Sequence, residues 1–374
     1  MPDLTDYRAQ IDEIDAQIAP LFARRMQVSE AVARYKLEHG MEVLQAGREQ
    51  VVLDRAEACV PEENRRDVRA LYREILHLSK AAQRRLLPSA PESAGAEWIQ
   101  DPLVGYFGVE GAFSEQAAMQ FFGPPARRVC FPSLEEVACA VREKRADYGV
   151  VPIENSSTGT ISECYDCISR ERLFIVGEQN VRIRQHLLAL PGAKLSDIRR
   201  VYSHAQGIAQ CGEFLHAHPD WQLIPYKNTA ISANKVFQDG DPSQAAIASS
   251  RAAERYGLNI LAADIHEDKK NHTRFVIVSR EMVDDPRAEK ASVVFNTRNQ
   301  PGALARVLNR FSEYDLNMTR LESRPIPQRP WEYVFYADFE GELQLGKLRR
   351  TLREIEPDTQ ALRLLGLYRK GEEA

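Results

Sequence analysis

The chain has 374 residues, of which 44% are hydrophobic and 28% charged, a balance typical of a soluble protein with two or three domains. Its formal net charge of −5 argues against a nucleic-acid-binding protein, which usually carries a strongly basic face. No apolar run approaches the roughly 20 residues of a membrane span, and the first residues lack the features of a signal peptide. We therefore expect a cytoplasmic protein with reduced cysteines.

Residues 4–87 predict an all-helical domain. Apolar residues recur at alternating steps of four and three along its first helix, the pattern of one long amphipathic helix: Tyr7, Ile11, Ile14, Ile18, Leu21, Val28, Val32 and Tyr35. Pro20 lies inside this helix and should kink it or cost about 3 kcal/mol. Shorter helices follow over 48–59 and 65–87, and the last should turn these residues inward: Val68, Leu71, Tyr72, Ile75, Leu78 and Leu86.

Four polar residues lie on the faces that these helices should bury: Arg25, Lys36, Ser79 and Gln83. Arg25 takes a slot on the apolar stripe, and Lys36 follows three turns later on nearly the same side. A buried arginine needs an anionic partner. The four residues therefore form one polar pocket or, as periodicity alone favours, lie partly exposed at the edge of the stripe.

This segment resembles the all-helical chorismate mutases across roughly its first 80 residues. The positions that carry the resemblance are Arg8, Arg25, Lys36, Arg48, Glu49, Ser79 and Gln83. It implies a pericyclic rearrangement that needs neither metal nor cofactor, because positioning and electrostatics suffice. By this resemblance Arg25 binds a carboxylate, and Lys36 and Gln83 stabilise charge on the ether oxygen. Glu49 holds the ring hydroxyl, and Arg48 and Ser79 hold the remaining polar groups.

Arg8 lies 17 residues before Arg25, about 25 Å along a helix and about 100° around its axis. One side chain cannot bridge that distance, so Arg8 can join the pocket only from another subunit. The mutase family has such an intertwined dimer, and we expect a homodimer. Pro20 and Gln45 depart from the family pattern and leave open a rival interpretation, in which this domain only dimerises.

A stretch rich in proline, serine and alanine follows, and we place the domains at 1–90, a linker at 91–101 and an α/β domain at 102–280. Seven segments predict its strands: 104–107, 148–153, 173–177, 200–202, 221–226, 245–249 and 274–279. This length could hold two lobes around a cleft. Small polar residues follow several strands, where such sheets bind ligands, and an anionic small molecule fits there. Ordinary helix capping explains some of them.

Neither a cofactor nor a metal is expected. Glycines at 105, 108 and 111 have the spacing GxxGxxG rather than the dinucleotide-binding GxGxxG. Cys164 and Cys167 form a CxxC without a second pair, so we interpret them as packing residues of a helix rather than zinc ligands. The histidines show no metal-binding spacing.

Three blocks of this domain resemble the signatures of prephenate dehydratases: VPIENSSTGTI at 151–161, VYSHAQGIAQC at 201–211 and NHTRFVIVS at 271–279. The resemblance implies loss of carbon dioxide and hydroxide from prephenate, with Thr273 as the catalytic hydroxyl. Glu154 is the alternative acid if the fold buries it, and the sequence does not choose between them. The other residues that it implies around the substrate are Asn155, Ser156, Ser203, Gln210 and Arg274.

Residues 290–370 predict elements in the order βαββαβ, a small ferredoxin-like module. PGALARVL at 301–308 and LESRP at 321–325 resemble the phenylalanine-binding blocks of ACT domains, with a plain docking module as the alternative. The residues implied in that regulatory site are Gly302, Ala303, Leu304, Glu322, Ser323 and Arg324.

The three segments together predict a multidomain protein with an all-helical, an α/β and a ferredoxin-like part. Their order is that of the bifunctional chorismate mutase–prephenate dehydratases of phenylalanine biosynthesis. The resemblance implies chorismate and prephenate as substrates and L-phenylalanine as a feedback effector, without a nucleic-acid or membrane partner. A rival of another class is a two-lobed ligand-binding sensor without catalysis, which would usually be exported.

Overall fold

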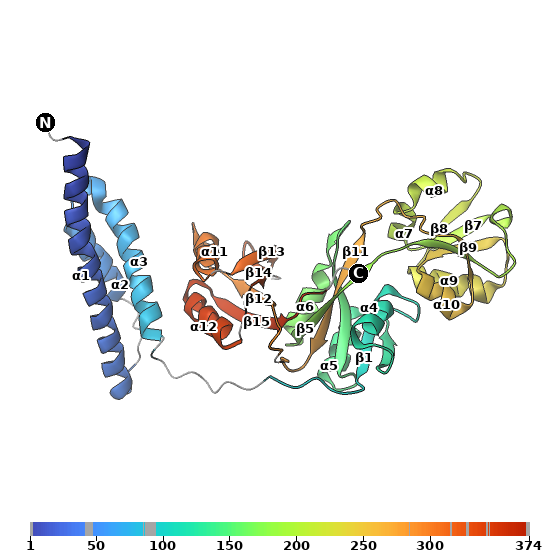
Figure 1. Cartoon of the computed structure of the whole chain (residues 1–374), viewed down its shortest axis with the longest axis horizontal. Helices are drawn as coiled ribbons and strands as arrows, with labels where there is room; N and C mark the ends of the chain where they lie inside the picture. The colour runs from blue at the N-terminus through green and yellow to red at the C-terminus, as the bar shows by residue number, and fades with distance from the viewer. Residues whose placement is uncertain are drawn as a thin grey trace. The chain divides into compact units, whose positions relative to one another are not determined.

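The computed structural model describes residues 3–41, 48–84, 86, 95–283, 285–314, 316–326, 329–341, 343 and 345–371. The chain divides into two compact units, Met1–Ser93 and Ala94–Ala374 (Figure 1). Within the described ranges, none of the helices combines the length and the apolar character that crossing a membrane requires.

The first unit contains the helices α1 (Leu4–Glu38), α2 (Arg48–Ala58) and α3 (Arg65–Arg84), with a short 3-10 helix (Glu62–Asn64) before the last. Helix α1 begins at Asp3, whose side chain accepts hydrogen bonds from the backbone N–H groups of Thr5 and Asp6. Pro20 lies inside α1 and does not end it, so the predicted single long helix is confirmed.

The apolar stripe of α1 is exposed. Its members are between 44% and 65% exposed: Leu4, Tyr7, Ile11, Ile14, Ile18, Leu21, Val28, Val32 and Tyr35. Leu71 and Leu78 of α3, which should have turned inward, are exposed as well. The prediction that these faces are buried is therefore wrong for the helical unit by itself, because its own described residues leave them exposed.

The second unit is built on a ten-stranded sheet with the order β13-β14-β12-β15-β5-β11-β3-β1-β2, to which β4 adds beside β3. The strands of its first lobe are β1 (Leu103–Phe107), β2 (Arg127–Phe131), β3 (Tyr148–Asn155), β4 (Gly159–Thr160), β5 (Phe174–Arg182) and β11 (His272–Ser279). Two apolar clusters cover this part of the sheet, one with α4 (Phe113–Phe122) and the other with α5 (Leu134–Arg142) and α6 (Ser162–Arg170).

A second lobe is inserted between β5 and β11, so two segments of chain connect the lobes. Its five-stranded sheet has the order β10-β6-β9-β7-β8. The strands are β6 (His186–Ala189), β7 (Arg200–Ser203), β8 (Gln222–Pro225), β9 (Gln244–Ala248) and β10 (Asn259–Ala262). The helices are α7 (Ala205–Ala209), α8 (Gly212–His216), α9 (Thr229–Asp239) and α10 (Ser250–Tyr256), arranged around that sheet (Figure 1). The prediction of two lobes is confirmed.

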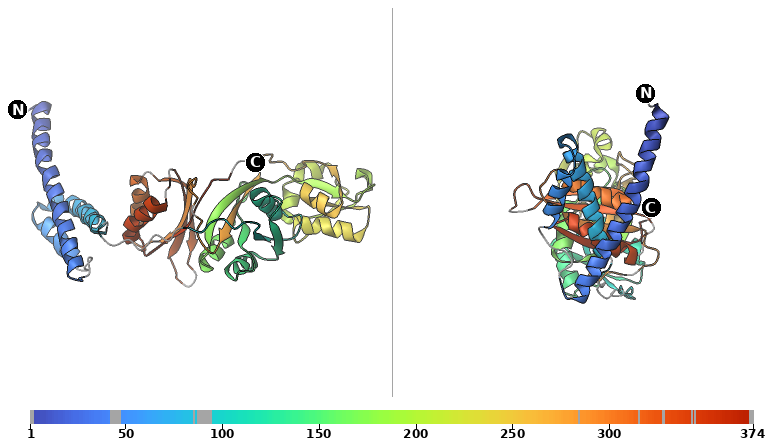
Figure 2. Two further views of the ribbon diagram at one scale, coloured as in Figure 1. Left: turned by 60° about the horizontal axis from the view of Figure 1, so that its bottom comes forward. Right: turned by 90° about the vertical axis from the view of Figure 1, so that its left-hand side faces the viewer.

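The C-terminal elements follow the predicted βαββαβ order. They are β12 (Lys290–Asn296), α11 (Ala303–Glu313), β13 (Asn317–Pro325), β14 (Tyr333–Glu340), α12 (Leu345–Ile355), a 3-10 helix (Glu356–Asp358) and β15 (Ala361–Tyr368). Helices α11 and α12, orange to red in Figure 2, pack on one face of these antiparallel strands. The ferredoxin-like fold is therefore confirmed.

The sheet of this C-terminal part is continuous with that of the first lobe. Strand β15 pairs in parallel with β5, where Gly366 lies opposite Ile175. A Cβ atom at Gly366 would lie 2.0 Å from the backbone oxygen of Ile175, so only glycine permits this approach. Val294 and Tyr336 also belong to the apolar cluster that α5 and α6 cover. The C-terminal part thus shares both sheet and core with the first lobe.

Part of the predicted linker packs on the first lobe. Residues 91–94 lie outside the described ranges, but the backbone N–H of Ala96 donates to Met282 O at 2.8 Å. The N–H of Ile99 donates to the Tyr148 hydroxyl at 3.0 Å. Residues 95–101 are therefore attached to the second unit.

Candidate active sites

Four residues of the predicted dehydratase site lie where β3 and β11 run side by side. The two strands are antiparallel, with Thr273 opposite Asn155 and Arg274 opposite Glu154. Because paired residues share a face and neighbours alternate, Thr273 and Asn155 lie on one face of the sheet and Arg274 and Glu154 on the other. The predicted site residues are thus divided between two faces.

Asn155 fixes the hydroxyl of Thr273. Its Oδ1 accepts the backbone N–H groups of Ser157 at 3.0 Å and Thr158 at 3.1 Å, which settles the orientation of the amide. The Nδ2 group then donates to Thr273 Oγ1 at 2.9 Å and to Asn271 Oδ1 at 2.7 Å. Thr273 Oγ1 is therefore an acceptor here, and its own proton has no acceptor among the residues that the structure describes.

Polar residues of the second lobe and of the connecting segments approach loop 156–158, which directly follows Asn155. Gln206 Nε2 donates to Thr158 Oγ1 at 3.2 Å, and Ser157 Oγ donates to Asp268 Oδ2 at 3.2 Å. Ser156 Oγ accepts the backbone N–H of His272 at 3.0 Å. Loop 156–158, the start of α7 and the segment before β11 therefore form one polar cluster beside Thr273.

Two other predicted ligands belong to the second lobe, where Gln210 is partly exposed and Ser203 is buried. Gln210 accepts a hydrogen bond from Gln185 Nε2 at 3.3 Å, next to the segment that connects β5 with the second lobe. Ser203 is fully buried in β7, and its hydroxyl donates to Ile247 O at 2.7 Å. This bond connects β7 with β9, so a structural role accounts for Ser203.

Glu154 and Arg274 extend from the opposite face, toward the C-terminal strands. Glu154 Oε2 lies 3.5 Å from Arg274 Nη1 and 3.7 Å from Arg320 Nε of β13. Glu154 thus lies on the face opposite Thr273, and its side chain is 37% exposed rather than buried.

Arg274 is held by protein groups on all three of its guanidinium nitrogens. Nε donates to Glu178 at 2.6 Å, Nη1 to Asp338 at 2.7 Å and Nη2 to the Tyr368 hydroxyl at 3.1 Å. Burial opposes its charge, but Tyr368, Asp338 and Glu178 more than offset this and raise the pKa of Arg274. For Asp338 burial likewise works against ionisation, yet Arg274 and Ser292 lower its pKa. The predicted contact of Arg274 with prephenate has no support in this arrangement.

The helical unit brings Arg25 and Ser79 together. Arg25 Nη1 donates to Ser79 Oγ at 2.6 Å and lies 3.5 Å from Ile75 O. Burial lowers the pKa of Arg25, with a smaller opposing contribution from Tyr72. Among the described residues no carboxylate lies within ion-pairing distance of Arg25. A half-buried guanidinium whose protein partners are neutral is suited to a carboxylate ligand.

The other predicted mutase residues differ in how far they are exposed. Lys36 and Gln83 are half-buried, and Glu49 forms an ion pair with Lys80 at 2.5 Å. Arg48 and Arg8 are exposed, and Arg8 lies near the opposite end of α1 from Lys36. Gln45 lies outside the described residues.

The predicted phenylalanine-binding residues divide between two faces of the C-terminal sheet. Gly302 caps α11 with a left-handed φ of 72°, and Ala303 and Leu304 begin that helix. Ser323 pairs with Phe335, which packs in the core beneath α11 and α12. Glu322 and Arg324 turn toward the first lobe, where they contact Thr160 at 3.1 Å and Asp166 at 3.0 Å.

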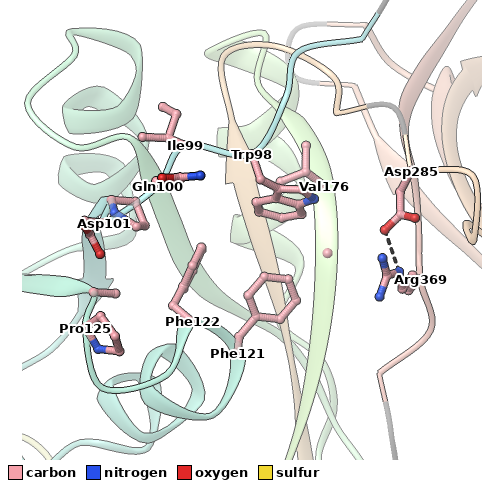
Figure 3. A pocket seen from close by; sticks show the side chains of 13 residues that line it. Trp98, Ile99, Gln100, Asp101, Phe121, Phe122, Pro125, Val176, Asp285 and Arg369 are labelled. Atoms are coloured by element: carbon pink, nitrogen blue, oxygen red, sulfur yellow. Dashed lines mark ion pairs between the residues drawn. The ribbon is translucent and has the colours of Figure 1, made fainter.

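A separate cavity of about 570 Å³ lies beside α4 and β5 (Figure 3). Trp98, Phe121 and Phe122 provide its aromatic wall, and an ion pair of 2.5 Å between Arg369 and Asp285 closes another side. None of the predicted site residues lines this cavity.

The cysteine pair of α6 is buried. Cys164 Sγ donates to Pro152 O at 2.6 Å, and burial raises the pKa of both Cys164 and Cys167, the latter to about 11. Two protonated thiols packed against the sheet support their interpretation as packing residues.

Comparison with known proteins assigns each segment. Family models match residues 7–84 as chorismate mutase type II, 104–283 as prephenate dehydratase and 291–357 as an ACT domain. The bifunctional chorismate mutase/prephenate dehydratase of Aquifex aeolicus (strain VF5) is 31% identical over 99% of this chain and 99% of its own length. The chain belongs to the bifunctional chorismate mutase/prephenate dehydratase family. The resemblance inferred from the sequence is thereby confirmed.

Solved structures agree for the second unit of this family member. The prephenate dehydratase of Arthrobacter aurescens in complex with L-Phe is 34% identical, with a TM-score of 0.66 over 72% of this chain and 90% of that one. GqqA, described as a novel type of quorum-quenching acylase, is 30% identical, with a TM-score of 0.66 over 72% of this chain and 98% of that one. The same fold is thus also found in a protein described by another activity.

Several residues that lie near Thr273 or bind Arg274 were not predicted from the sequence. Asn271, Thr158 and Gln206 lie inside the three quoted blocks, so inspection of every polar position in them would have found these residues. Glu178 and Asp338, which bind Arg274, belong to β5 and β14. No local pattern signals these two, because only the tertiary structure brings them to β11.

Proposed function

We propose that this protein rearranges chorismate to prephenate in its helical unit and converts prephenate to phenylpyruvate between the lobes of its second unit. Membership of the bifunctional family supports both activities. The observation that most supports the dehydratase is the Thr273 hydroxyl, which Asn155 binds at 2.9 Å with its proton left for a ligand.

In the dehydratase step, prephenate loses its ring carboxylate as carbon dioxide, and the electrons of that bond make the ring aromatic as the hydroxyl leaves. The group beside the substrate must therefore hydrogen-bond to the departing oxygen. Thr273 can donate to that oxygen, because Asn155 occupies its lone pair and orients the hydroxyl. Neither a metal nor a cofactor is needed for this step.

In the mutase step no group on the protein bonds to the substrate, so catalysis depends on positioning and electrostatics. Arg25 is the proposed carboxylate ligand, because it is half-buried and, among the described residues, its hydrogen-bond partners are the neutral atoms of Ile75 and Ser79. Lys36 and Gln83 are the proposed partners of the ether oxygen, and Arg48 and Glu49 of the other polar groups.

A homodimer is part of this proposal. The exposed stripe of α1 repeats at steps of three and four residues, which is the spacing of a helix that packs along another helix. Burying a large apolar side chain stabilises a protein by about 1.5–3 kcal/mol, so an exposed stripe of this length favours association. A second copy would also supply Arg8 to the pocket that contains Arg25.

Regulation by L-phenylalanine completes the proposal. The Arthrobacter aurescens prephenate dehydratase forms a complex with L-Phe, which supports an effector of this kind, and we place its site in the ACT part. Here Gly302 leaves the start of α11 free of a side-chain cap, and a helix N-terminus suits a carboxylate. Ser323 extends from the neighbouring strand on the same side of the sheet.

Assays of the purified chain with each substrate test the proposal. Chorismate should yield prephenate and then phenylpyruvate, and added prephenate should yield phenylpyruvate directly. Turnover of prephenate without turnover of chorismate would support the rival in which the helical unit only dimerises. A chain that binds prephenate but turns over neither substrate would be the non-catalytic sensor.

A further inference from the structure

The residue after Thr273 connects the dehydratase site to the C-terminal strands. Arg274 donates to Asp338 of β14 at 2.7 Å and to Tyr368 of β15 at 3.1 Å. Its third partner, Glu178 of β5 at 2.6 Å, belongs to the first lobe. Glu154 of β3 is a fourth, more distant partner at 3.5 Å, so the predicted sensor supplies two of the four groups around this side chain.

These partners are themselves fixed by further hydrogen bonds. Ser292 Oγ donates to Asp338 Oδ1 at 2.6 Å and lies 2.6 Å from the Tyr368 hydroxyl. Lys290 Nζ lies 2.9 Å from Glu178. All five of these residues are buried, and two cations, Arg274 and Lys290, face two buried carboxylates. Removing one carboxylate would leave a buried cation incompletely neutralised, and Arg274 would have to move.

A movement of Arg274 would be transmitted to Thr273 because the two are adjacent in β11. The register of β11 against β3 shifts between Arg274 and Phe275, which marks an irregularity in the strand at this point. Such bulges alter the direction of nearby side chains. Thr273 extends from the opposite face of β11. If a movement of Arg274 rotates the strand locally, the hydroxyl of Thr273 therefore changes direction.

We propose that Asp338 is a positioning residue for the dehydratase reaction, acting through Arg274 to fix the direction of the Thr273 hydroxyl. This inference depends on the proposed dehydratase function. It also gives the C-terminal strands a physical means of changing catalysis, since a ligand that moves β14 moves a partner of Arg274.

Asp338→Asn tests the proposal, because it keeps the shape of the side chain and removes its charge. We expect the dehydratase kcat to fall at least tenfold, about 1.4 kcal/mol, while KM for prephenate stays within threefold. A loss confined to kcat indicates a misdirected Thr273 rather than a damaged binding site. Mutase turnover in the same preparation should not change.

Asp358→Asn is the matched control. Asp358 belongs to the 3-10 helix after α12 and lies 3.7 Å from the buried Arg310 in the same C-terminal part. Its substitution weakens another arginine–aspartate pair, so it should lower the melting temperature without changing the dehydratase kcat. If both variants lose kcat in proportion to melting temperature, Asp338 has only a structural role and the proposal is overturned.

If the Asp338→Asn protein does not fold, Ser292→Ala provides a second test of the same proposal. It removes the hydrogen bond to Asp338 without removing a charge, and kcat should fall at least threefold. A kcat within threefold of wild type for Asp338→Asn, or unchanged for Ser292→Ala, would contradict the inference alone. Wild-type protein that forms no phenylpyruvate from prephenate would overturn the proposed function as well.

Discussion

The hydroxyl of Thr273 is the proposed donor to the departing oxygen of prephenate. Thr273→Ala removes the hydrogen-bond donor to the departing oxygen, so phenylpyruvate formation should fall at least 100-fold, within the usual range for such a group. Thr273→Ser keeps a hydroxyl for Asn155 to orient and should stay within tenfold of wild type. Steady-state rates with prephenate measure both. Dehydratase activity of the alanine variant within threefold of wild type would remove Thr273 from the mechanism.

Arg25 is the corresponding residue in the helical unit. Its half-buried guanidinium is the proposed carboxylate ligand, so Arg25→Ala should reduce chorismate turnover at least tenfold, about 1.4 kcal/mol of barrier. The matched control is Arg24→Ala, which removes an exposed arginine of the same helix and should have little effect. Equal activity of the two variants would show that Arg25 does not bind the substrate.

At this scale the sequence singled out three blocks that the structure brings close together, but not the direction of each side chain. Thr273 and Arg274 are adjacent in one motif, and the resemblance put both beside prephenate. Alternation along β11 sends them to opposite faces, and the same rule separates Asn155 from Glu154. The partners of Arg274 come from distant segments, so only the tertiary structure identifies them.

Helix α1 is the element whose interpretation changed most. Its stripe of apolar residues correctly predicted a long helix, and Pro20 did not end it. Periodicity indicates which face of a helix is apolar. It does not indicate whether that face is covered by the same chain or by another chain. Within the helical unit the stripe is exposed, and we propose that a second copy of the chain covers it.

Subunit mixing tests whether that partner is a second copy. Arg8→Ala and Arg25→Ala proteins should each lack mutase activity. In a mixed dimer one pocket would contain both defects and the other neither, so activity should return when the two are mixed. Mutase rates before and after subunit exchange measure this. No recovery once exchange has been verified would mean that Arg8 is not donated between subunits.

Four strands were not predicted from the sequence, and each of them is short or lies at the edge of a sheet. Strand β2 is the edge of the large sheet and contains two arginines, β4 has only two residues, and β6 and β10 have four each. Short strands leave little pattern, and edge strands accept charged residues. Long central strands such as β3 and β11 were predicted because they are buried on both faces.

At the scale of the whole molecule, the order of the parts was predictable but the continuity of the second unit was not. The C-terminal strands looked like an independent module in the sequence. Strand β15 instead joins β5 at Gly366, and Asp338 reaches Arg274. These contacts join segments far apart in the chain, which no local pattern can reveal.

Regulation of the dehydratase by L-phenylalanine would involve the C-terminal part and the first lobe together. L-phenylalanine should bind near Gly302 and lower dehydratase activity, and coupling between sites usually changes affinity about 5–150-fold. Gly302→Val places a side chain at a left-handed φ and near Arg306, so more phenylalanine should be needed for the same inhibition. Calorimetry and inhibition curves measure both effects. An unchanged phenylalanine affinity in the variant would place the effector elsewhere.

The central claim is that one chain contains two separate active sites acting in sequence, and a time course from chorismate tests it most directly. Wild-type protein should form prephenate transiently and then phenylpyruvate. Thr273→Ala should accumulate prephenate, whereas Arg25→Ala should leave chorismate unconsumed yet convert added prephenate at the wild-type rate. Loss of both reactions in either variant, or no phenylpyruvate from the wild-type protein, would contradict the account.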